Sequence, residues 1–132
     1  MKVIWKLRIP STSLVDSPEL QVLPRRCYVL RLLTEEETEN ITTLTFHNVI
    51  AYRCTYDWGC NAKVISEAYD KLVDYGNTPW LGEIAEVVRG RSDSLSRMLK
   101  HVGIYFDDGP HYEFICWDVR IADGSSTPEV TG

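Results

Sequence analysis

The segment from His101 to Ile121 constrains the fold more than any other part of the chain. Its sequence is HVGIYFDDGPHYEFICWDVRI, in which two alternating, aromatic-rich runs flank the tetrapeptide Asp-Asp-Gly-Pro. An Asp-Gly pair between two such runs is a strong short-range signal for a β-hairpin. The segment therefore predicts two antiparallel strands joined by a tight turn.

The position of the proline selects the register of this hairpin. A two-residue loop would place Pro110, which has no N–H, in the ladder opposite an aspartate. A three-residue loop over 107–109 avoids this, because a type I turn followed by a left-handed glycine gives a G1 bulge. In that register Phe106 faces Pro110, and Tyr105 faces His111.

This register gives the hairpin one apolar face and one mixed face. The apolar face, which we predict to be core, collects Val102, Ile104, Phe106, Tyr112, Phe114 and Cys116. The second face collects His101, Tyr105, His111, Glu113, Ile115 and Trp117. Because one face of such a hairpin should be buried, the apolar pattern supports the three-residue loop.

Alternating apolar residues predict further strands earlier in the chain. They are expected over residues 3–9, 26–33, 41–46 and 49–56. The last three follow one another closely, which favours an antiparallel meander. Residues 10–24 are rich in serine and proline, and they predict a long loop.

The apolar period changes after residue 59. Residues 60–75 repeat apolar side chains at three- and four-residue spacing, which predicts an amphipathic helix. Thr78-Pro79 then predicts the start of a second helix, with threonine as N-cap and proline at the first helical position. Gly90 ends this helix, and Ser92 or Asp93 is expected to cap a short third one.

Strands first, helices next and a hairpin last are typical of an α+β domain. We predict a mainly antiparallel sheet of about six strands, with two to three helices inserted before the C-terminal hairpin. The hairpin should complete the same sheet, with the helices covering one face. Residues 1–123 are expected to form this single domain, and residues 124–132 to form a flexible tail.

Composition excludes several classes of function. The net charge of −5 argues against nonspecific nucleic-acid binding. No apolar run approaches the roughly 20 residues of a membrane helix, and the first ten residues lack a signal-peptide pattern.

The four cysteines show no Cys-x-x-Cys spacing, so free thiols are favoured over a zinc site. We therefore expect a cytoplasmic protein without a metal or another cofactor.

The second hairpin face holds the main candidate site. The predicted binding residues are Tyr105, Asp107, Asp108, His111, Glu113 and Trp117. A histidine beside a carboxylate can act as a general base or bind a divalent metal. However, turn aspartates commonly bind their own backbone, and a solvent-facing strand needs polar residues. We therefore assign no catalytic residues and no metal ligands.

Three other features of the sequence are weaker candidates for a site. The segment YRCTYDWGC over residues 52–60 precedes the first predicted helix, where an anion could bind. It has one glycine and no phosphate-loop motif, so we expect Trp58 to pack beneath the helix instead. No G-x-S-x-G nucleophile motif occurs, and Cys116 lies on the apolar face. Trp80 and Trp117 are candidate anchors of a protein interface.

The segments YDKLVDYGNTPWL and YFDDGPHYEFIC carry a resemblance to other proteins. Over residues 45–121 the chain resembles a group of small bacterial α+β proteins of similar length that have no established activity. As a compact acidic α+β domain it is also similar to bacterial immunity proteins, which neutralise toxins by binding them. The resemblance implies a binding role and assigns no catalytic residue.

We therefore predict a small protein that binds another protein, or itself, through an acidic and aromatic surface around the hairpin. This leading prediction does not include an enzymatic activity. The alternative is a small-ligand- or metal-dependent enzyme that uses Asp107, Asp108, His111 and Glu113.

Overall fold

The computed structural model describes residues 1–7, 11–13, 18–32, 42–107 and 110–122. Across these residues the strands are β1 (Lys2–Lys6), β2 (Glu19–Leu23), β3 (Cys27–Leu32), β4 (Thr42–His47), β5 (Ala51–Thr55), β6 (Lys71–Asp74), β7 (Lys100–Tyr105), β8 (His111–Cys116) and β9 (Asp118–Ala122). The helices are α1 (Ala62–Ala68), α2 (Pro79–Arg89) and α3 (Asp93–Ser96), with 3-10 turns η1 (Ser11–Ser13) and η3 (Asp57–Gly59). The predicted tail, 124–132, lies outside the described residues.

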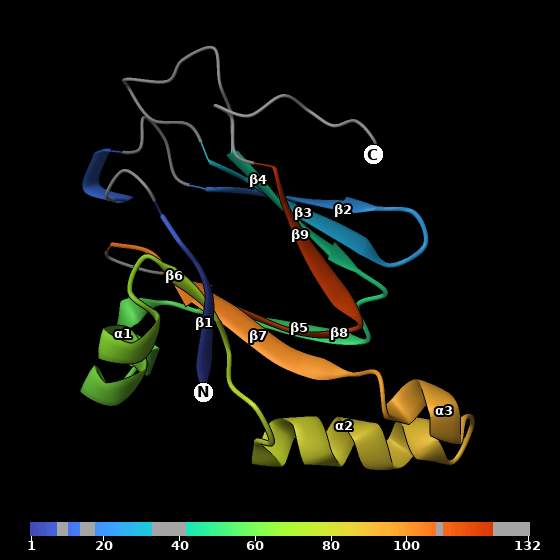
Figure 1. Cartoon of the computed structure of the whole chain (residues 1–132). Coiled ribbons are helices and arrows are strands. Elements are labelled where there is room, and N and C mark those ends of the chain that lie inside the picture. The colour runs from blue at the N-terminus through green and yellow to red at the C-terminus, as the bar shows by residue number, and fades with distance from the viewer. Residues whose placement is uncertain (8–10, 14–17, 33–41, 108–109, 123–132) are drawn as a thin grey trace.

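The strands form two antiparallel sheets that pack face to face (Figure 1). One sheet has the order β1-β6-β7-β8-β5, and the other has the order β2-β3-β4-β9. The helices lie on the outer side of the five-stranded sheet (Figure 1). The prediction of an antiparallel α+β fold is confirmed, but the strands divide between two sheets.

The predicted meander over 26–56 is broken between β4 and β5. β3 pairs with β4 as expected, whereas β5 pairs with β8 of the hairpin. Asn48, at a φ of 56°, reverses the chain after β4, and buried Val49 follows it. The second hairpin run also breaks, because β8 ends at Cys116 and β9 joins the other sheet. The two points where the chain passes from one sheet to the other, after β4 and after β8, are joined by a 3.1 Å hydrogen bond from the Trp117 N–H to the His47 carbonyl.

The helix predicted over 60–75 is also shorter than expected. α1 ends at Ala68, Asp70 adopts a φ of 55°, and β6 follows. Leu72 and Val73 are both fully buried, but Leu72 packs into the core between the sheets and Val73 packs against α1. A strand buried on both faces shows a continuous apolar run, which sequence periodicity does not separate from a helix.

Part of the loop predicted over 10–24 is likewise regular structure, since β2 pairs along β3. Both ends of the second helix and the start of the third agree with prediction, whereas α3 ends at Ser96, before Met98 and Leu99, through which the helix was predicted to extend. The Thr78 hydroxyl accepts a 3.3 Å bond from the Leu81 N–H, and Pro79 is the first residue of α2. The Ser92 hydroxyl caps α3 in the same way, at 3.2 Å from the Leu95 N–H.

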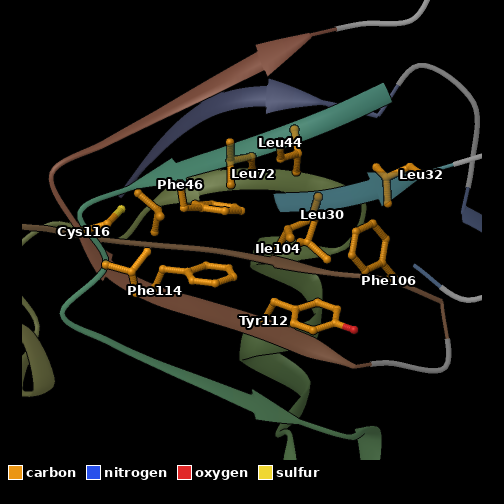
Figure 2. Packing of buried hydrophobic residues seen from close by; sticks show 12 residues of the cluster. Leu30, Leu32, Leu44, Phe46, Leu72, Ile104, Phe106, Tyr112, Phe114 and Cys116 are labelled. Carbon is orange, nitrogen blue, oxygen red and sulfur yellow. The ribbon is translucent and has the colours of Figure 1, made fainter. Parts of the chain in front are cut away.

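The register predicted for the hairpin is confirmed. Tyr105 pairs with His111, and the Phe106 N–H donates to the Pro110 carbonyl at 3.3 Å. The turn conformation at 108–109 lies outside the described residues. The predicted apolar face is buried as a whole between the sheets, where Figure 2 shows it meeting Leu30, Leu44 and Phe46 of the other sheet.

The described helices are too short and too polar in sequence to span a membrane. None of the four cysteines, all of which lie in the described residues, forms a disulfide.

Phe114→Ala tests the core between the sheets. The Phe114 ring is fully buried and stacks on Phe46 with 3.9 Å between the ring centroids. We expect the substitution to lower the free energy of unfolding by about 3–5 kcal/mol, because it removes this contact and leaves a cavity. Urea denaturation measures the change. Val87→Ala, at a site 70% exposed on α2, is the control and should stay within about 0.5 kcal/mol of wild type. Equal losses in the two variants would contradict this packing.

Candidate functional site

The second hairpin face is covered rather than open. His101, His111 and Glu113 are only 4–6% exposed, and Tyr105 is buried with them. α1 and its neighbours pack against Tyr105, while α2 and α3 pack against Ile115. The side chains share a face as predicted, but this face is not the solvent-exposed binding surface expected from the sequence.

Glu113 has room in this layer because a glycine lies opposite it. Gly103 pairs with Glu113 in the β7–β8 ladder. A Cβ at Gly103 would lie 2.9 Å from both the Tyr112 carbonyl and a ring carbon of Tyr75, and 3.3 Å from the Cγ of Glu113. The missing side chain therefore lets Tyr75 and Glu113 approach the strand together.

Arg53 binds the Glu113 carboxylate from the neighbouring strand. The two residues pair directly in the β5–β8 ladder. Nε of Arg53 lies 3.0 Å from Oε2 of Glu113, and Nη2 lies 3.1 Å from Oε1. The guanidinium also stacks over the ring of Trp80, at 4.0 Å from the centroid. This bidentate geometry is the strong form of a charge-assisted hydrogen bond.

His101 links the same carboxylate to the start of α2. Its Nε2 lies 2.8 Å from Oε1 of Glu113, and its Nδ1 lies 2.7 Å from Oγ1 of Thr78. An ionised carboxylate only accepts hydrogen bonds, so Nε2 carries a proton. With the imidazole neutral, Nδ1 accepts the hydroxyl proton of Thr78, whose oxygen also accepts from the Leu81 N–H.

His111 joins the carboxylate to a second hydroxyl. Its Nδ1 lies 3.4 Å from Oε2 of Glu113, and its Nε2 lies 2.8 Å from Oη of Tyr75. Burial lowers the pKa of His111, although the charge of Glu113 acts in the opposite direction. Burial also raises the pKa of Tyr75, so the phenol keeps its proton and donates it to Nε2.

Glu113 remains ionised in this setting. Burial alone would raise the pKa of its carboxyl group, but hydrogen bonds from His101 and Arg53, helped by the charge of the Arg53 guanidinium, outweigh it. Together they lower the pKa to about 2. Within the described parts of the chain, no group of three or more His, Cys, Asp or Glu residues is placed to hold a metal ion.

A pocket of about 420 Å³ opens beside this network. It lies between the five-stranded sheet, α1 and the start of α2. Its lining combines the network with aromatic, aliphatic and acidic side chains: Arg53, Val64, Glu67, Tyr75, Thr78, Pro79, Trp80, Glu83, His101, His111 and Glu113. The pocket thus brings two hydroxyls, two imidazoles, three carboxylates and one guanidinium to a single cavity.

The other residues predicted for the site lie elsewhere. Oδ1 of Asp107 accepts a 2.7 Å bond from the Tyr69 hydroxyl, and the Asp107 N–H donates to the Ser11 hydroxyl at 2.8 Å. The bond to Asp107 raises the pKa of Tyr69 to about 12. Trp117 packs with the α2–α3 cluster and lines a separate pocket. Asp108 lies outside the described residues.

Sequence reasoning brought His111 and Glu113 together but missed their partners. Arg53 reaches Glu113 only through the β5–β8 pairing, which the predicted meander did not contain. Thr78 was identified as a helix cap, and Tyr75 was placed inside a helix. His101 was assigned to the correct face by alternation. The glycine at position 103 is the signal in the sequence that space was needed opposite Glu113.

A second surface lies along the outer edge of β5. We call it the β5 edge surface, and it comprises Tyr52, Cys54, Tyr56 and Trp58. The exposed fractions are 98% for Trp58, 65% for Tyr56 and 42% for Tyr52. Tyr52 also packs on Tyr28, with 5.1 Å between their ring centroids.

The exposure of Trp58 corrects the prediction that it packs beneath the first helix. In η3 the Gly59 N–H bonds to the Tyr56 carbonyl at 2.8 Å, which folds the turn tightly. A Cβ at Gly59 would lie 2.7 Å from Cγ2 of Thr55, so the glycine side of the turn faces the strand. The indole is left in solvent. Trp80, a predicted interface anchor, instead packs on Arg53 and His101.

Comparisons with protein-family models, with curated proteins and with solved structures found no match for this chain.

Glu113→Gln tests the charge at the centre of the network. The pKa of this group is 4.5 when unperturbed and about 2 in the folded protein. Its contribution is therefore fully present above about pH 4.5 and is lost as the pH falls toward 2. The difference corresponds to about 3 kcal/mol, so wild type should lose that much stability across the window and the variant much less. Urea denaturation at several pH values measures this, with Glu86→Gln on the exposed side of α2 as control. Parallel pH profiles for wild type and Glu113→Gln would contradict an ionised buried carboxylate.

His111→Gln tests the buried neutral imidazole in a different pH range. Because the folded-state pKa of His111 lies below 6.5, the unfolded state takes up a proton first as the pH falls. The free energy of unfolding of wild type should therefore decrease as the pH falls below 6.5. The variant should show a smaller decrease between pH 7 and pH 5. The control variant His47→Gln, at a half-buried site outside the network, should follow wild type. An unchanged slope in His111→Gln would show that this imidazole does not cause the acid sensitivity.

Proposed function

We propose that this chain is a protein-binding module that docks its partner along the β5 edge surface. The observation that carries the proposal is the full exposure of Trp58 beside an open strand edge. Tryptophan and tyrosine are the residues most enriched at the energetic centres of protein interfaces. The binding surface thus lies next to the hairpin, on the strand that pairs with β8, rather than on the covered face of the hairpin.

β5 is well suited to accept a strand from a partner. Open strand edges in soluble proteins are usually protected by charged side chains. The edge strands β1, β2 and β9 carry charges such as Lys2, Glu19 and Arg120, all exposed. The one charged residue of β5 is Arg53, and its guanidinium is bound to Glu113 on the helix side of the sheet.

Strand addition gives this surface both affinity and selectivity. The backbone of an extended partner segment would bond to the outer side of β5, and its side chains would meet Tyr52, Cys54 and Tyr56. Such pairing supplies hydrogen bonds from the backbone, while alternate side chains provide specificity. Trp58 extends the contact beyond the end of the strand.

The proposal also accounts for the composition. A net charge of −5 favours partners that are neutral or basic, and an immunity-like or accessory role is of this binding class. We further propose a cytoplasmic location, because four cysteines without a disulfide suit a reducing compartment.

A capture experiment with matched variants tests the proposal. Immobilised wild type should retain a defined partner from a lysate of the source organism, and Trp58→Ala should retain at least about 30-fold less, the effect of removing a hot-spot residue. Val87→Ala, which removes an exposed apolar side chain on α2, should behave as wild type. Mass spectrometry of the retained fraction identifies the partner.

Hydrogen exchange then locates the contact. Adding the captured partner should protect the β5 amides that do not bond to β8. Sedimentation of the isolated chain separates partner binding from self-association. Equal capture by wild type and Trp58→Ala, or protection confined to another edge strand, would refute docking on the β5 edge surface.

A further inference from the structure

The pocket beside Glu113 has features that protein binding along β5 does not use. His101, His111 and Glu113 line it and are each more than nine-tenths buried. Its volume of about 420 Å³ falls within the usual range for small-molecule sites. A cavity in which buried ionisable groups converge is where a bound small molecule would meet reactive side chains.

Two hydrogen bonds connect the Glu113 carboxylate, through His101, to the Thr78 hydroxyl. Oε1 of Glu113 lies 2.8 Å from Nε2 of His101, and Nδ1 of the same ring lies 2.7 Å from Oγ1 of Thr78. The carboxylate fixes the proton on Nε2, which leaves the Nδ1 lone pair directed at the hydroxyl. An acid, a base and a hydroxyl in this order constitute the arrangement that activates a nucleophile.

Helix capping alone does not require this arrangement. A threonine N-cap needs only its own oxygen and a backbone N–H of the first turn. Burying a carboxylate and two imidazoles carries a large desolvation cost, and apolar residues of similar volume often hold a fold as well. Thr78, whose hydroxyl ends this series of hydrogen bonds, also lines the pocket rather than the core.

We propose that Thr78 is a nucleophile activated by His101 and Glu113, and that the pocket accepts a small carboxylic ester. This inference is independent of docking along β5. The positive end of the α2 dipole lies at Thr78, where it stabilises the negative charge that develops on the reacting oxygens.

The reaction is an acyl transfer in two balanced steps. As Oγ1 of Thr78 bonds to the acyl carbon, its proton passes to Nδ1 of His101. The bond from the acyl carbon to the leaving alkoxide then breaks, and the alkoxide takes the proton from Nδ1. Water next attacks the acyl-threonine as Nδ1 of His101 accepts one of its protons. The bond from Oγ1 to the acyl carbon then breaks, Oγ1 takes the proton back from Nδ1, and the carboxylic acid leaves.

The lining of the pocket restricts the substrate. Arg53 is bound to Glu113 and Lys63 is paired with Glu67, which leaves the carboxylate of Glu83 as the lining charge that would repel an anionic ester. Trp80 and Val64 provide apolar contact for a short acyl chain. The geometry therefore selects an uncharged or cationic ester with a small acyl group.

Covalent labelling with a neutral alkyl fluorophosphonate tests the proposal on the full chain. The reagent should form a phosphonyl adduct at position 78 in wild type and in T78S, and peptide mass spectrometry locates it. T78N should give no adduct there, although asparagine caps a helix as well as threonine does. H101Q should label about 100-fold more slowly, because it lacks the general base. Thermal melting followed by circular dichroism confirms that each variant is folded.

A matched readout uses p-nitrophenyl acetate. Wild type should release a burst of about one nitrophenolate per chain, as expected for an acyl-enzyme, and T78N should release none. The absence of a phosphonyl adduct at Thr78 in folded wild type would overturn the proposal. An adduct on Tyr75 that persists in T78N, or labelling of folded H101Q at the wild-type rate, would also overturn it.

Discussion

The ionised carboxylate of Glu113, buried between an arginine and two histidines, is the constraint on which the outer layer of this protein depends. Three strands contribute its partners: Arg53 comes from the distant β5, and His101 and His111 come from the β7–β8 hairpin that also carries Glu113. Through His101 the network reaches the N-cap of α2, and through His111 it reaches Tyr75 after β6. A carboxylate that lost one of these partners would remain buried with less compensation, so the position of α2 and the pairing of the edge strand β5 are tied to one charge.

The parts of the fold predicted from sequence are those set by local alternation and by caps. The register of the hairpin followed from Pro110 and from the apolar face, and the start of α2 followed from Thr78. The pairing of β5 with β8 could not be predicted in this way, because Arg53 and Glu113 are far apart in the chain and no local pattern relates them. β6 was mistaken for helix because Leu72 and Val73 are buried on opposite faces, which removes the two-residue alternation.

The polar residues of the hairpin show why composition alone misplaced the binding surface. His111 and Glu113 alternate with apolar residues, as side chains on a solvent-facing strand do, yet they are buried with mutual partners. Conversely, Trp58 has a large aromatic side chain of the kind expected in a core, yet it is almost fully exposed. In both cases the outcome depends on tertiary neighbours: polar groups can be buried when their partners arrive from other strands, and a tight turn can direct an indole outward.

Arg53 connects the two regions to which functions are proposed. Its backbone belongs to the edge strand that would receive a partner, whereas its guanidinium holds the carboxylate at the pocket. Strand addition along β5 would order the backbone of Arg53 and thereby restrict the motion of the guanidinium over Trp80. Because Trp80 lies in the first turn of α2 beside Thr78, the same restriction would reach the pocket hydroxyl. Binding energy gained at the edge could in this way favour one geometry of the pocket, and by linkage an occupied pocket would favour partner binding to the same degree.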